Sequence, residues 1–245
     1  MIELAASDGP VETWLSRPDT EEALPGVLFF MDAIGLRQRI YGMADRIASW
    51  GYVVMAPNVF YREGAASELA PREPLRNPEA RAAFFADAGP RIARLTSDLA
   101  LADIDAYVHA LSSRHGVTTP IGVVGYCMGA RLAVRAAGAH ADIVHACGGF
   151  HGGGLATDDA DSPHLALATA RGEFVFGHAD EDPGMSPDAV RRLGEALSAA
   201  GLTASNEIYP GTRHGYTMAD TAVYDDAGTE RHFEALRDLF ARTLG

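Results

Sequence analysis

The stretch Gly125-Tyr126-Cys127-Met128-Gly129 follows directly on the apolar run Ile121-Gly122-Val123-Val124 and precedes a small, helix-forming stretch at residues 130–134. This order of strand, sharp turn and helix matches the nucleophile elbow G-x-S-x-G, with cysteine in the place of serine. So abrupt a turn leaves no room for side chains two residues to either side of the nucleophile, which explains both glycines. The N-terminus of the following helix directs N–H groups and a positive dipole end at the sulfur, which favours a thiolate. The stretch therefore predicts that Cys127 is a nucleophile.

The alternative for Cys127 is that of a small buried apolar residue, the usual environment of a free cysteine after a strand. The two flanking glycines, placed between a strand and a helix, favour the nucleophile instead. Cys147 lacks such neighbours and is predicted to be a core residue of the next strand.

Strand-like and helix-like stretches alternate along the chain, which is typical of a mostly parallel sheet covered by helices on both faces. The first two strands, residues 2–5 and 11–15, flank Asp8-Gly9 and predict an N-terminal β-hairpin. Buried strands are expected at residues 26–31, 52–56, 121–126, 144–149, 173–177 and 205–209, with helices at 36–50, 90–111, 128–139, 187–200 and 229–243. Residues 62–78 are expected to form a long excursion that caps a substrate site. Residues 1–245 are thus predicted to form a single α/β domain.

The composition excludes several functional classes. A net charge of −13 and a pI near 5.0 argue against nucleic acid or an anionic membrane as a partner. All 20 basic residues are arginine, and without lysine there is neither a Walker A phosphate loop nor a Schiff base with pyridoxal, so no cofactor is expected. The two cysteines imply no disulfide framework, and no signal peptide or apolar run long enough for a membrane span is visible. We expect a cytoplasmic protein.

A catalytic cysteine needs a base, and the base needs a carboxylate that orients it. In nucleophile-elbow enzymes both follow the nucleophile, the acid before the histidine. His214 meets these conditions, because it lies between the last predicted strand and the C-terminal helix and is followed by Gly215. The acid is expected in the loop after residues 173–177, where Asp180 and Asp182 are both candidates, with Asp182 preferred. A metal site of His178 with these two carboxylates is a weaker interpretation of the same loop.

Together the elbow with cysteine, the acidic loop and His214-Gly215-Tyr216 resemble the dienelactone hydrolase family of α/β-hydrolases, and the resemblance extends over nearly the whole chain. Residues 31–35, Met31-Asp32-Ala33-Ile34-Gly35, resemble the Glu-x-x-Gly segment of that family, with Asp32 in place of the glutamate. The resemblance implies an α/β-hydrolase fold. It also implies a soluble enzyme that acts on a small-molecule ester or lactone.

The resemblance assigns a role to each matched position. Cys127 is the implied nucleophile, His214 the base and Asp182 its partner, since the segment from Asp182 to Pro187 looks most like the family's acid loop. The backbone N–H groups of Met128 and Ala33 are the implied oxyanion hole. Asp32 is expected near the sulfur, where it would keep the resting thiol neutral. Its alternative is a carboxylate at the N-terminus of the helix at residues 36–50.

One position departs from the family. Members that bind the carboxylate of dienelactone carry an arginine four residues after the catalytic histidine, and here that residue is Met218. Methionine cannot form a bidentate carboxylate clamp, so a less charged or differently shaped ester is expected. A second anchoring arginine of the family corresponds to Arg81. The candidate apolar walls of the substrate site are Tyr126, Phe60, Phe84 and Phe85, although core packing is the favoured role for at least half of them.

The sequence thus predicts a hydrolase that cleaves a lactone or carboxylic ester through a Cys-His-Asp triad and a thioester acyl-enzyme. The alternative is a non-catalytic thiol protein of the same fold that senses oxidants through Cys127. A base at His214 in triad order favours the enzyme, since a sensor has no need of one. A third hypothesis is nucleotide binding, with residues Gly122–Gly129 as a dinucleotide-binding loop, but the glycine spacing does not match G-x-G-x-x-G. Neither the natural substrate nor the oligomeric state follows from the sequence.

Overall fold

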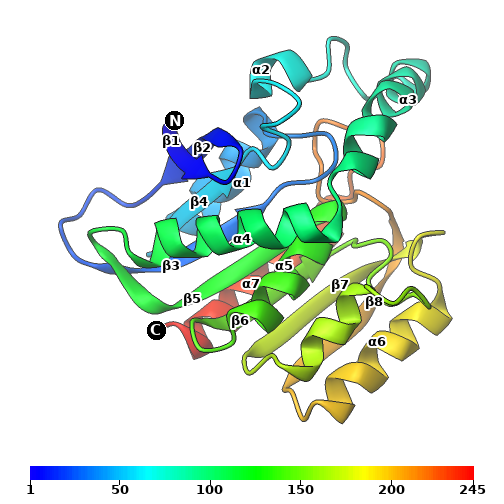
Figure 1. Ribbon diagram of the computed structural model, residues 1–245. Helices are drawn as coiled ribbons and strands as arrows, with labels where there is room; N and C mark the ends of the chain where they lie inside the picture. The colour runs from blue at the N-terminus through cyan, green and yellow to red at the C-terminus, as the bar shows by residue number, and fades with distance from the viewer.

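One sheet of eight strands organises the chain, in the order β1-β2-β4-β3-β5-β6-β7-β8, in a computed structural model that describes residues 1–245 (Figure 1). β1 and β2 pair antiparallel, as do β2 and β4, and all other neighbours are parallel. The strands are β1 (Ile2–Ala6), β2 (Gly9–Ser16), β3 (Leu24–Phe30), β4 (Val53–Pro57), β5 (Val117–Tyr126), β6 (Val144–Phe150), β7 (Glu173–Glu181) and β8 (Ala204–Arg213). The predicted α/β class and the N-terminal hairpin are therefore confirmed.

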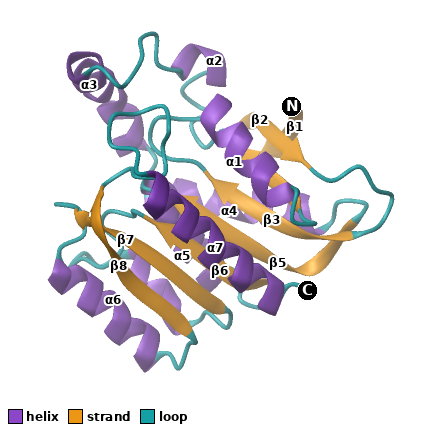
Figure 2. Cartoon of the chain, turned by 180° about the vertical axis from the view of Figure 1, so that it is seen from behind, coloured by secondary structure: helices purple, strands orange, loops and turns teal.

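Helices cover both faces of this sheet. Figure 1 shows α4 (Ser97–Ser112), α5 (Met128–Ala139) and α6 (Pro187–Ala199) in front of it, and Figure 2 shows α1 (Gln38–Ala48) and α7 (Asp226–Thr243) on the opposite face. A short 3₁₀ helix, η1 (Pro163–Ala168), packs against α5 and α6. The central strands are buried on both faces and read as continuous apolar runs, as in Val27–Phe30. One cluster of 59 buried residues extends through both layers between sheet and helices.

Two helices lie apart from the layered core. Helices α2 (Ala66–Leu69) and α3 (Pro78–Arg94) stand beyond the edge of the sheet in both views (Figures 1 and 2). Here the prediction of a single helix at residues 90–111 is wrong, because the chain forms α3 and α4 instead. Thr96 separates them, since its side-chain oxygen accepts a hydrogen bond from the N–H of Leu99 and begins α4 as an N-cap. None of the helices combines the length and apolar character needed to cross a membrane.

Candidate active site

The cysteine of the elbow sits on a strained turn between β5 and α5. Cys127 has a φ of 54° and a ψ of −117°, a conformation that residues with a side chain rarely adopt. A Cβ atom on Gly125 would lie 2.0 Å from the carbonyl oxygen of Gly129, and a Cβ atom on Gly129 would lie 2.3 Å from that of Phe30. Both glycines are therefore required by close backbone contacts. The turn brings the side chain of Cys127 to the carboxyl end of the sheet, where it is partly exposed.

Three side chains from three connections form one hydrogen-bonded series. Nε2 of His214, just after β8, lies 3.0 Å from Sγ of Cys127. Nδ1 of the same ring lies 2.6 Å from Oδ2 of Asp182, just after β7. The other carboxylate oxygen of Asp182 accepts a hydrogen bond from the N–H of Gly184 at 2.8 Å, so the carboxylate is held from both sides. Parallel strands end at the same edge of the sheet, which is why these distant residues meet.

The hydrogen bonds of His214 decide its charge. Burial alone would lower the pKa of the ring, but hydrogen bonds to Asp182 and Cys127 outweigh it and raise that pKa to about 10. The ring is therefore an imidazolium at neutral pH, with one N–H directed at Asp182 and the other at Cys127. A cation 3.0 Å from the sulfur stabilises a thiolate.

The other groups of the acidic loop are engaged elsewhere. Oδ2 of Asp180 accepts a hydrogen bond from the N–H of Gly211 at 2.9 Å, and Nε2 of His178 lies 2.7 Å from Oδ1 of Asn206. The structure thus places Asp182, and not Asp180, against His214. No group of three His, Cys, Asp or Glu side chains in the chain is arranged to bind a metal ion.

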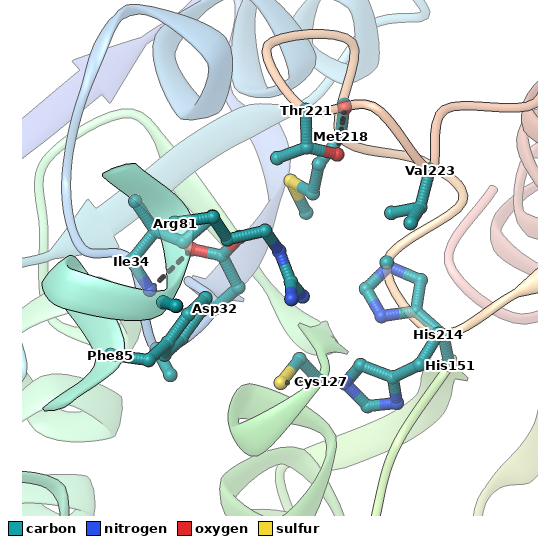
Figure 3. Close-up of a pocket in the computed structure, with 13 residues that line it drawn as sticks. Asp32, Ile34, Arg81, Phe85, Cys127, His151, His214, Met218, Thr221 and Val223 are labelled. Atoms are coloured by element: carbon teal, nitrogen blue, oxygen red, sulfur yellow. Dashed lines mark hydrogen bonds between the residues drawn. The ribbon is translucent and has the colours of Figure 1, made fainter. Parts of the chain in front are cut away.

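A cavity of about 270 Å³ opens beside the cysteine (Figure 3). Its wall combines the elbow, the β3–α1 connection, α3 and the segment after His214, and consists of Asp32, Ala33, Ile34, Arg81, Ala82, Phe85, Cys127, His151, His214, Gly215, Met218, Thr221 and Val223. The side chain of Arg81 extends from α3 into the middle of this cavity (Figure 3). Its guanidinium forms no ion pair, its Nε has no hydrogen-bond partner, and it lies over the ring of Phe85 at 4.9 Å. An unpaired cation thus faces the cysteine.

Asp32 lies in the wall of the cavity, but its carboxylate is directed to an arginine and not to the sulfur. Oδ1 of Asp32 lies 2.7 Å from Nη1 of Arg37 and accepts hydrogen bonds from the N–H groups of Ile34 and Gly35, while Oδ2 lies 3.1 Å from Nη2 of Arg37. The expectation that Asp32 holds the resting thiol is therefore not met. The amides it caps belong to the turn before α1, not to that helix.

Three of the four expected aromatic walls do not line this cavity, which corrects the sequence interpretation. Tyr126 is fully buried on the side of β5 that faces away from the cavity, where its hydroxyl lies 3.1 Å from Nε2 of His232 and its ring stacks on Phe29. Side chains alternate between the faces of a strand, so the residue next to the nucleophile points into the core. Phe60 is likewise a core residue. Phe85 does line the cavity, whereas Phe84 lines a neighbouring one.

His151 also lines the cavity, although it is not among the site residues predicted from the sequence. It follows β6 with a φ of 38°, and its ring meets that of His214 edge-on at 5.5 Å. Nε2 of His151 lies 2.8 Å from Oγ1 of Thr217, while Nδ1 is buried without a partner. Burial, together with the neighbouring rings of His214 and His232, lowers the pKa of His151 well below its ordinary value, which favours the neutral ring. The sequence feature that could have placed His151 at the site is its position directly after a predicted parallel strand, which it shares with Cys127.

Two backbone amides beside the cysteine have no acceptor. Met128 is the first residue of α5, and Ala33 lies in the turn after β3. Neither N–H donates to a backbone carbonyl or to a side chain, and both residues are almost fully buried. Free, buried N–H groups next to a nucleophile are the donors that an oxyanion hole requires.

Known proteins resemble this chain along its whole length. The model of the dienelactone hydrolase family matches residues 11–244. A Salmonella typhi protein, provisionally named carboxymethylenebutenolidase, is 24% identical over 236 residues, which make up 95% of this chain and 83% of that relative. The structure of a provisionally named dienelactone hydrolase from Klebsiella pneumoniae matches with a TM-score of 0.79 at 20% identity and covers 98% of both chains. A dienelactone hydrolase-like promiscuous phosphotriesterase from metagenomic libraries matches with a TM-score of 0.75 at 16% identity, over 100% of this chain and 97% of that one. The shared architecture is the α/β-hydrolase fold.

Proposed function

Because the chain belongs to the dienelactone hydrolase family and is a carboxylic ester hydrolase or lactonase, we propose that Cys127, His214 and Asp182 cleave the ester through a thioester acyl-enzyme. The observation that carries the proposal is the continuous series from Sγ of Cys127 through both ring nitrogens of His214 to the buried carboxylate of Asp182. Nucleophile, base and orienting acid are each within hydrogen-bond distance of the next.

Acylation begins with the thiolate of Cys127, which attacks the carbonyl carbon of the ester or lactone. The carbonyl oxygen becomes an oxyanion, and the free N–H groups of Met128 and Ala33 stabilise it. When the tetrahedral intermediate collapses, the C–O bond of the ester breaks and the imidazolium of His214 donates its Nε2 proton to the departing alkoxide. The products of this half-reaction are an alcohol and a thioester on Cys127. In a lactone, that alcohol remains attached to the acyl chain.

Deacylation uses the same groups in reverse. The neutral imidazole of His214 takes a proton from water, the resulting hydroxide adds to the thioester, and the C–S bond breaks to release the acid and restore the thiolate. A thiolate is a better leaving group than an amide nitrogen, so the intermediate formed from an amide returns to substrate. The mechanism therefore favours esters and lactones over peptides.

Trapping of the acyl-enzyme tests this mechanism. After rapid mixing with p-nitrophenyl acetate and an acid quench, we expect an acetyl group on Cys127 by peptide mass mapping, together with a burst of p-nitrophenol. The second cysteine is the internal control, because Cys147 is 1% exposed and burial raises the pKa of its thiol. An acetyl group on another residue, or steady turnover with Cys127 unmodified and no burst, would contradict the proposal.

Arg81 supports a proposal that departs from the less charged ester expected from Met218, namely that the substrate carries an acid group. The relatives named carboxymethylenebutenolidase act, by that name, on a lactone that bears a carboxylate. Here Met218 replaces one expected arginine, but the unpaired guanidinium of Arg81 faces Cys127 and is free to bind an anion (Figure 3). A single charge-assisted contact of this kind is worth about 1.5–3 kcal/mol, or roughly 10- to 100-fold in affinity.

Arg81→Gln measures this contact. We expect KM for a carboxylated ester to rise about 10-fold or more while KM for p-nitrophenyl acetate stays constant, because only the first substrate has an anion for the guanidinium. Arg76→Gln is the matched control, since Arg76 is exposed, donates to the carbonyl oxygen of Ala219 and does not line the cavity. An equal loss on both substrates would show that Arg81 shapes the cavity and does not select the acid.

A further inference from the structure

A buried arginine that the proposed mechanism does not use joins the two segments that form the active site. Arg37, the residue before α1, is only 9% exposed and extends to the segment that follows His214. Its Nε and Nη2 contact the carboxylate of Asp220 at 2.5 and 3.2 Å, and its Nη1 and Nη2 contact that of Asp32 at 2.7 and 3.1 Å. Nη1 also donates to the carbonyl oxygen of Gly35 at 3.0 Å, and Nη2 lies 3.4 Å from Sδ of Met218. All the donor nitrogens of the guanidinium are therefore engaged.

The two carboxylates belong to segments with different roles. Asp32 immediately precedes Ala33, whose free amide is one of the two donors in the proposed oxyanion hole. Asp220 lies in the loop that follows His214 and contains Met218. Because β3 and β8 lie far apart in the sheet order, no strand pairing fixes one of these segments relative to the other. Two arginine side chains do so: Arg37, which contacts both carboxylates, and Arg39 of α1, whose Nε donates to the carbonyl oxygen of Thr217 at 3.0 Å.

We propose that Arg37 is a positioning residue, which holds the amide of Ala33 in the place where the oxyanion forms. The proposal rests on the proposed function, since it needs an oxyanion beside Cys127. A guanidinium is a rigid, planar fork, so two-point contacts to each carboxylate set direction as well as distance. Although burial alone would lower the pKa of Arg37, the charges of Asp32 and Asp220 raise it, so the bridge stays charged.

Met218 fits this arrangement. Its side chain is 1% exposed and presents a neutral thioether to Nη2 of Arg37. A second guanidinium at that position would be buried against the first, and the repulsion would oppose it. The guanidinium beside Met218 thus comes from the β3–α1 connection and is directed towards two carboxylates.

Two substitutions with a matched control test the role. Arg37→Lys keeps the charge but cannot contact both carboxylates at two points each, and Asp220→Asn weakens the bridge at its half-exposed end. Arg62→Lys is the control, because Arg62 also bridges two aspartates, Asp8 and Asp103, yet does not line the cavity. For each protein we would measure kcat and KM for p-nitrophenyl acetate, the rate at which iodoacetamide alkylates Cys127, and the melting temperature.

We expect kcat to fall about 10- to 100-fold in Arg37→Lys and at least several-fold in Asp220→Asn, with KM almost unchanged, because a misplaced oxyanion donor weakens binding of the transition state. Alkylation needs the thiolate but no oxyanion hole, so its rate should remain that of the wild type. The control variant should keep both its kcat and its alkylation rate.

Three results would overturn the role of Arg37: an unchanged kcat in Asp220→Asn and Arg37→Lys, an alkylation rate that falls in proportion to kcat, or an equal loss of kcat in Arg62→Lys. Failure of the proposed function is separate and is seen in the wild type alone. If alkylated Cys127 leaves hydrolysis intact, the thioester mechanism is wrong, and the role of Arg37 falls with it.

Discussion

Cys127→Ala is expected to lower kcat for p-nitrophenyl acetate by about 10⁴-fold or more, to the level that the oxyanion hole and substrate binding alone provide. Without Sγ no thioester forms, and His214 is left beside a methyl group with no bond-forming partner. The loss should appear in kcat and kcat/KM together, since the sulfur stabilises the transition state and not the bound substrate. Initial rates with purified protein, followed by p-nitrophenol absorbance, measure it.

Cys147→Ala is the matched control for this substitution. Cys147 lies in β6, is fully packed in the core and does not line the cavity, so its replacement should reduce stability but leave kcat unchanged. The melting temperature of each variant separates loss of fold from loss of the nucleophile. Hydrolysis by Cys127→Ala at a rate near that of the wild type would rule out the cysteine as nucleophile and direct attention to water activated by His214.

Asp182→Asn is expected to reduce kcat about 10³- to 10⁴-fold, the range seen when the acid of such a triad becomes an amide. An amide can present its NH₂ group to Nδ1 and so favour the wrong tautomer of His214, and it removes the negative charge that stabilises the imidazolium. The pKa of His214 should then fall from about 10 towards its ordinary value near 6.5. An NMR titration of the histidine ring protons in both proteins measures this shift.

The same pKa determines how stability changes with pH. A histidine whose pKa is raised on folding contributes stability that is fully present below its unfolded pKa and is lost as the pH rises through its folded pKa. The Asp182–His214 contact should therefore stabilise the wild type most at neutral pH and below, and this advantage over Asp182→Asn should shrink as the pH approaches about 10. The carboxylate of Asp180 contacts only the backbone N–H of Gly211, so Asp180→Asn is the control and should keep the wild-type kcat and the wild-type pKa of His214. An unchanged kcat in Asp182→Asn would contradict the assignment.

Local pattern was enough to predict most of the fold and the candidate chemistry. The alternation of strands and helices predicted a mostly parallel sheet covered by helices on both faces. The two glycines around Cys127 predicted a sharp turn, and the close backbone contacts at both glycines confirm it. The order of elements led to His214 and to the acidic loop. The contact with His214 in the folded chain then distinguished Asp182 from Asp180, because the two lie in one loop and their side chains point in different directions.

What the sequence could not supply was contact between distant segments. Arg37 looked like an ordinary residue before a helix, since nothing local indicates that Asp220 lies against it. His151 was not predicted as a site residue, because its strained φ and its contact with His214 exist only in the folded chain. Tyr126 was misplaced for the opposite reason: it adjoins the nucleophile in sequence, but strand alternation turns it into the core. The break between α3 and α4 depended on one capping threonine.

The position of α3 separates recognition from chemistry in this protein. The groups proposed to break the ester lie at the carboxyl edge of a rigid sheet, whereas the cation proposed to select the acid, Arg81, belongs to a helix that stands outside the layered core. We therefore expect changes in the segment from α2 to α3 to alter the range of acids accepted more than the distances around Cys127. Replacement of residues 62–95 by the same segment of a relative is a direct way to change substrate preference while keeping the catalytic groups intact.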